Sequence, residues 1–89
     1  MKQFISSLPL DLVNSEGKKY RIKLPIQSGG KAGKGHNKTS TIQVVYEGMM
    51  AVKQIRYTVR DHESKMAAIE KAIAYVVGPK TAKTYFHEI

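Results

Sequence analysis

The chain has 89 residues, of which 15 are Lys or Arg, seven are Asp or Glu, and none is Cys. A chain of this length makes one small domain with a modest core, and we expect residues 1–89 to form a single domain. Without cysteine, disulfides, thiolate metal sites and cysteine nucleophiles are excluded, and a cytoplasmic location is the simple expectation. A hydrophobic content of 42% argues against disorder. The chain has no run of about 18 apolar residues, so no membrane span is expected.

Positive charge is concentrated in the middle of the chain. Residues 18–60 hold ten of the 15 basic residues and a single acid, Glu47, whereas the rest of the chain is almost neutral. A localised positive field attracts polyanions and speeds their encounter.

The first half of the chain predicts two strands joined by a turn. Leu8, Leu10 and Leu12 alternate with polar residues around Pro9, which is typical of an edge strand. Turn-forming residues occupy positions 14–17. Residues 19–26 then show the cleanest period-two pattern, with apolar residues inward and a cationic outer face made by Lys19, Arg21 and Lys23.

Residues 28–40 combine four glycines with three lysines, Lys31, Lys34 and Lys38, and contain no large apolar side chain. This composition predicts a flexible basic loop. It does not match a phosphate-binding P-loop, because His36 stands where that motif needs Lys.

Two further strands are expected, over residues 41–47 and 50–60. In the second, Ile55, Tyr57 and Val59 alternate inward, and Arg56 and Arg60 point outward. Lys53 breaks the inward set, so a bulge or a late start near this residue is expected.

The pattern then changes to helical spacing. Asp61 is a helix N-cap, an apolar stripe of Met66, Ile69, Ile73 and Val76 follows, and the Gly-Pro pair at 78–79 ends the helix. Residues 81–89 are expected to form a short final strand or a docked tail.

These elements predict an α+β fold: a small antiparallel sheet of three to four strands with one C-terminal amphipathic helix packed on one face. The other face is then left to solvent or a ligand, and like charges on its neighbouring strands favour a polyanion. The alternative is that the charges only solvate the face and protect it from aggregation. The candidate nucleic-acid contacts are Lys19, Arg21, Lys23, Lys31, Lys34, Lys38, Arg56 and Arg60.

Nothing in the sequence predicts catalysis, a metal or a cofactor. His36, His62 and His87 do not form a ligand set, and the seven acids are scattered over caps, turns and the helix.

The segment from Thr41 to Tyr75, with its hairpin, strand and Asp-led helix, resembles the AP2-type DNA-binding module and the arm-binding domains of tyrosine integrases. The matching residues are Arg60 to Ala68, followed by Ala74 and Tyr75. The chain lacks the tryptophan often found on that family's sheet, and Thr58 stands where the family usually has glycine. The resemblance implies a three-stranded sheet that enters the major groove of DNA.

We therefore expect a non-enzymatic module that binds nucleic acid, with double-stranded DNA favoured over RNA and no membrane contact. One alternative is a small phage-type inhibitor or adaptor, of the anti-defence kind, that binds a protein partner. Another is a structural component of a ribonucleoprotein.

Overall fold

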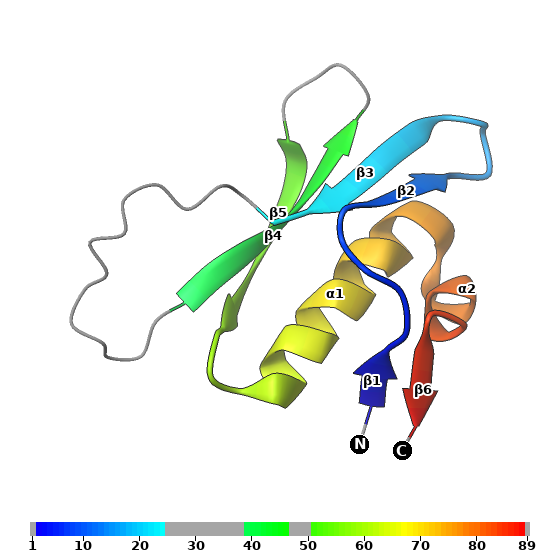
Figure 1. Cartoon of the computed structure of the whole chain (residues 1–89). Coiled ribbons are helices and arrows are strands. Elements are labelled where there is room, and N and C mark those ends of the chain that lie inside the picture. The colour runs from blue at the N-terminus through cyan, green and yellow to red at the C-terminus, as the bar shows by residue number, and fades with distance from the viewer. Residues whose placement is uncertain (1, 25–38, 47–50, 89) are drawn as a thin grey trace.

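The structure is a computed structural model that describes residues 2–24, 39–46 and 51–88. It confirms the predicted α+β class, with one helix packed on an antiparallel sheet (Figure 1). The elements in chain order are β1 (Lys2–Phe4), β2 (Leu10–Val13), β3 (Lys19–Lys23), β4 (Thr39–Tyr46), β5 (Ala51–Thr58), α1 (His62–Val77), α2 (Pro79–Lys83) and β6 (Phe86–Glu88).

The main sheet has four antiparallel strands in the order β2-β3-β4-β5. The strand β2 lies at an edge, as its sequence predicts, but it begins only at Leu10, after Pro9. A tight loop joins β2 to β3. The backbone N–H of Gly17 donates to the carbonyl of Asn14, and Asn14 Oδ1 accepts hydrogen bonds from the backbone N–H groups of Glu16 and Lys18. Gly17 has a φ of +82°, a conformation that glycine adopts without steric cost.

The strands β4 and β5 pair over most of their length and contain the predicted irregularity. Lys53 lies opposite Val44, but Ala51 lies opposite Val45, so Val52 is an extra residue in β5. This is the β-bulge expected near Lys53. The strand β4 begins at Thr39, earlier in the chain than the sequence pattern indicated.

The helix α1 packs its apolar stripe against one face of this sheet. Met66, Ile69, Ile73 and Val76 are all buried, as predicted, and meet Ile22, Ile42 and Val44 of the central strands. Asp61 caps the helix by accepting hydrogen bonds from the backbone N–H groups of Glu63 and Ser64. Gly78 ends it, and Pro79 then starts the short helix α2, which the sequence did not suggest.

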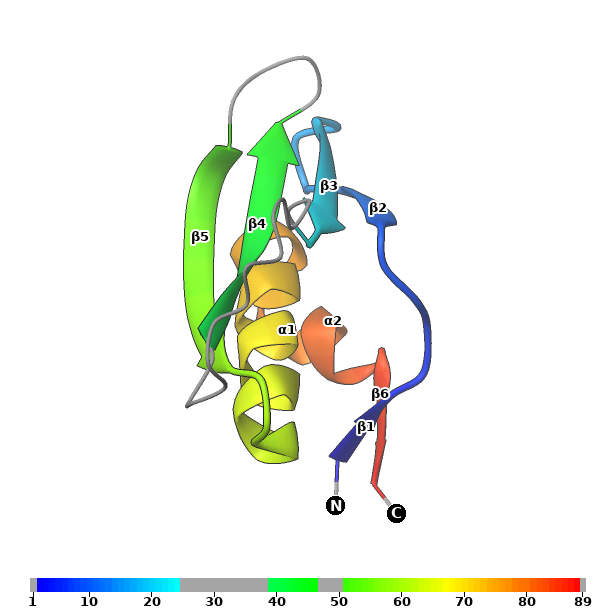
Figure 2. The same ribbon diagram turned by 60° about the vertical axis from the view of Figure 1, so that its left-hand side comes forward.

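A small ribbon formed by the two ends of the chain covers α1 on another side. The strands β1 and β6 pair antiparallel, and the rings of Phe4 and Phe86 lie 5.4 Å apart. The ribbon is held to α1 because Phe4 N–H donates to Met66 Sδ and Lys2 forms an ion pair with Glu70. Figure 2 shows the helix between the main sheet and this ribbon, so the fold has three layers. Of the two alternatives for the C-terminal segment, the short strand is the observed one.

No helix in the described part of the chain is long and apolar enough to cross a membrane.

Candidate nucleic-acid interface

The face of the main sheet that points away from α1 is referred to here as the open face. Neither of the two described helices covers it (Figure 2). The register fixes its residues, because partners across neighbouring strands share a face and side chains alternate along each strand. Buried Ile22, Ile42 and Val44 define the helix side. The described charged and amide side chains of the open face are therefore Asp11, Lys19, Arg21, Lys23, Gln43, Gln54 and Arg56.

Four of the predicted basic residues meet on this face. Lys19, Arg21 and Lys23 stand at alternate positions of β3, and Arg56 stands on β5 opposite Thr41 of β4. From the usual residue rise and strand spacing, these four cations form a diagonal row of about 20 Å across the sheet. One acid, Asp11, lies among them, so the described part of the face is strongly cationic.

Arg60 does not belong to the open face. The strand β5 ends at Thr58, and Arg60 lies in the turn that leads into α1, where the Asp61 N–H bonds back to the Thr58 carbonyl. The expectation that Arg60 extends the outward set of the strand is therefore wrong, because the chain leaves the sheet to start the helix. Lys31, Lys34 and Lys38, with the rest of the predicted basic loop up to residue 38, lie outside the described residues.

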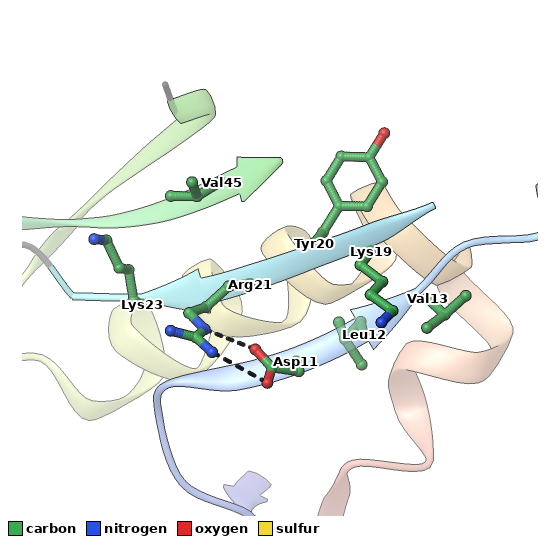
Figure 3. Close-up of a pocket in the computed structure, with 8 residues that line it drawn as sticks. All are labelled: Asp11, Leu12, Val13, Lys19, Tyr20, Arg21, Lys23 and Val45. Carbon is green, nitrogen blue, oxygen red and sulfur yellow. Dashed lines mark hydrogen bonds and ion pairs between the residues drawn. The ribbon is translucent and has the colours of Figure 1, made fainter. Parts of the chain in front are cut away.

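Arg21 is paired with Asp11, its direct neighbour across β2 and β3 (Figure 3). Arg21 Nε donates to Asp11 Oδ1 at 2.7 Å, and Arg21 Nη2 donates to Asp11 Oδ2 at 3.3 Å. This hydrogen bonding is the main cause that lowers the pKa of the Asp11 carboxyl, and the positive charges of Arg21 and Lys19 add to it. The same hydrogen bond raises the pKa of Arg21. The pair is exposed, so solvent screens it and its contribution to stability is small.

A hollow of about 540 Å³ adjoins this ion pair. The residues that line it come from β2, β3 and β4 and are Asp11, Leu12, Val13, Lys19, Tyr20, Arg21, Lys23 and Val45, as Figure 3 shows. Lys19, Arg21 and Lys23 are spread along β3 beside this hollow with one carboxylate, Asp11, and the apolar part of its lining comes from Leu12, Val13, Tyr20 and Val45.

Two glutamines near the centre of the open face were missed by the sequence analysis. Gln43 on β4 lies between Lys23 on β3 and Gln54 on β5, so the three residues form one row across the sheet. The alternation of both strands placed them outward, but only charge was used to select candidate contacts. A glutamine amide both donates and accepts hydrogen bonds, which allows it to recognise base edges.

The aromatic residues of the four main strands lie on the opposite side of the sheet. Tyr57 is buried, Tyr20 packs against the core, and Tyr46 is its cross-strand partner with ring centroids 5.1 Å apart. The described part of the open face thus has no aromatic platform on which unpaired bases could stack.

Among the described residues, no group of three or more His, Asp or Glu side chains is arranged to hold a metal ion. His62 instead donates from Nε2 to the Lys2 carbonyl at 3.0 Å and helps to fasten the ribbon to α1.

No family model, curated protein or solved structure matches this chain. The resemblance to AP2-type and integrase arm-binding modules accordingly remains a prediction from the sequence.

Proposed function

We propose that the protein is a non-enzymatic module that binds double-stranded DNA through the open face of its sheet. The observation that carries the proposal is that Lys19, Arg21, Lys23 and Arg56 share the open face, which neither of the described helices covers. Phosphate contacts supply most of the affinity of such a surface, and the major groove of B-DNA is wide enough to admit two neighbouring antiparallel strands.

Two features favour a duplex over a single strand. The tyrosines of the main strands pack on the helix side, so stacking of unpaired bases has no described partner on the open face. The amides of Gln43 and Gln54 occupy neighbouring positions in the middle of the face, where they are suited to the edges of stacked base pairs.

Binding to a random-sequence DNA duplex should depend steeply on salt. If Lys19, Lys23 and Arg56 each neutralise a phosphate, log K should fall against log salt with a slope of about −3. Replacing Lys19 and Lys23 by Ala should make this slope shallower by about 2, as measured by fluorescence anisotropy from low to physiological salt.

A matched control removes two lysines from another part of the molecule. Lys80 and Lys83 are exposed on α2, which lies on the other side of α1 from the main sheet, and replacing both by Ala changes the net charge equally. If the two double variants lost the same amount of DNA affinity and salt dependence, only net charge would matter, and the proposed surface would be contradicted. Parent protein that fails to bind duplex DNA at low salt would overturn the function and favour a protein partner.

A further inference from the structure

The guanidinium of Arg21 is held in one orientation by Asp11. The carboxylate accepts from Nε at 2.7 Å and from Nη2 at 3.3 Å, so both of its oxygens engage the same side of the guanidinium. The two residues are direct cross-strand neighbours on β2 and β3, and the sheet therefore fixes the backbone of both partners. An arginine restrained in this way loses less side-chain entropy when it binds a ligand.

Within the described part of the chain, Asp11 is the partner of Arg21, and this arrangement leaves the outer edge of the guanidinium available. Arginine has five N–H donors, and Asp11 uses one on Nε and one on Nη2. The remaining Nη1 and Nη2 donors lie side by side and point away from the carboxylate. They form the fork that binds two acceptors at once.

The presence of Asp11 also determines which acceptors suit this fork. A phosphate brought to Arg21 would lie near the Asp11 carboxylate and be repelled by it. A neutral base edge carries no net charge and avoids most of that repulsion. Guanine presents two acceptors, O6 and N7, in the major groove with the spacing that arginine matches. Lys19 and Lys23, on either side of Arg21 along β3, are placed to contact phosphates instead.

We propose that Arg21 is a guanine-reading residue and that Asp11 is the positioning residue that directs it to a base edge rather than to phosphate. This inference rests on the proposed function, because it assigns a base preference to the same surface. It predicts that removing the negative charge of Asp11 weakens discrimination between sequences, although the protein becomes more positive.

The test compares alternating dG·dC and dA·dT duplexes of equal length, together with a dG·dC duplex in which 7-deazaguanine replaces guanine and removes the N7 acceptor. The parent should prefer the dG·dC duplex by roughly fivefold to a hundredfold and lose most of that preference with 7-deazaguanine. Asp11→Asn should reduce the preference for dG·dC to less than half of the parent's value. It should bind the dA·dT duplex at least as tightly as the parent does. Arg21→Lys keeps the charge but removes the fork, so it should lose the preference with an unchanged salt slope.

Glu63→Gln is the matched control, since it removes one negative charge from an exposed position in the first turn of α1. It should keep the guanine preference. The proposal is overturned if Asp11→Asn tightens binding to both duplexes by the same factor, or if 7-deazaguanine has no effect in the parent. Absence of binding to either duplex would instead refute the proposed function, so the two failures are distinguishable.

Discussion

At the scale of single residues, the contact between Asp11 and Arg21 has more effect on orientation than on stability. The side chains of both partners are more than half exposed, at 71% for Asp11 and 55% for Arg21, so water and salt weaken their attraction. Their geometry nevertheless uses both carboxylate oxygens and two guanidinium donors. An exposed pair with this geometry favours one direction for the outer edge of Arg21, which is the property a recognition residue needs.

The titration of Asp11 gives a direct measurement of this pairing. Its pKa should lie below the ordinary value for Asp because Arg21 hydrogen-bonds the charged carboxylate. A lowered pKa means that the pair is intact at neutral pH and is lost as the pH falls through that lowered value. Carboxyl carbon shifts followed by NMR should show this, and Arg21→Gln should return the pKa of Asp11 toward its ordinary value. An Asp11 titration that is identical in the two proteins would contradict the pairing.

The alternation of Leu10 and Leu12 places Asp11 on the outer face, but its pairing with Arg21 could not be obtained from the turn that the sequence suggests. A four-residue turn over 14–17 would pair Val13 with Lys18 and place Asp11 opposite Tyr20, on the buried side. The observed loop is one residue longer, because Gly17 adopts a positive φ and Val13 pairs with Lys19. A shift of one residue exchanges the two faces of a strand. The cations of β3 were predictable from alternation alone, but their acidic partner depended on this backbone detail.

At the scale of secondary-structure elements, α1 is the part of the molecule that sequence predicts best. Its cap, its apolar stripe and its end depend on residues close together in the chain, and all three are observed. The turn after β5 was less predictable. Val59 continues the alternation of that strand, yet it is 44% exposed, because the chain has already turned toward the helix. Alternation gives no information about where a strand stops.

Because α1 is the central layer, its buried side chains should dominate stability. Ile73 is fully buried, and Ile73→Ala should lower the free energy of unfolding by about 2–5 kcal/mol through lost burial and the cavity that remains. Lys71→Ala on the exposed side of the same helix is the control and should change stability by less than about 0.5 kcal/mol. Urea denaturation followed by circular dichroism measures both. An Ile73→Ala variant as stable as the Lys71→Ala control would show that α1 does not pack as described.

At the scale of the whole molecule, the ribbon is the feature that local sequence patterns could not reveal. It pairs Lys2 with Glu88 at opposite ends of the chain, and each of its strands has only three residues. Strands this short carry almost no alternation, and their pairing depends on contacts with Met66 and Glu70 of α1. The open face, in contrast, follows from strands joined in sequence order, so its general position was predictable.

Two groups of cations in the described part of the molecule lie on different layers of the fold. One lies on the open face, with Lys19, Arg21, Lys23 and Arg56. The other lies near the chain ends, where Lys83 of α2 and Lys2 of β1 line a second hollow, of about 270 Å³, together with Glu88. The second surface is less suited to a polyanion, because only two lysines line it beside Glu88, whereas four cations share the open face with one acid. The two surfaces lie on opposite sides of α1, so a spectroscopic map can separate them (Figure 2).

We expect that adding duplex DNA at low salt will shift the backbone amide resonances of β3, β4 and β5 and leave those of β1, α2 and β6 almost unchanged. The physical reason is that the described cations of the open face outnumber its one acid, and that acid is already bound by Arg21. Two-dimensional ¹⁵N–¹H spectra during the titration measure this, and the Lys19 and Lys23 double variant should show smaller shifts at the same DNA concentration. Resonance shifts concentrated in α2 and β6 would show that DNA binds near the chain ends and not at the open face. They would also leave Asp11 and Arg21 without a role in recognition, since that pair lies in the main sheet.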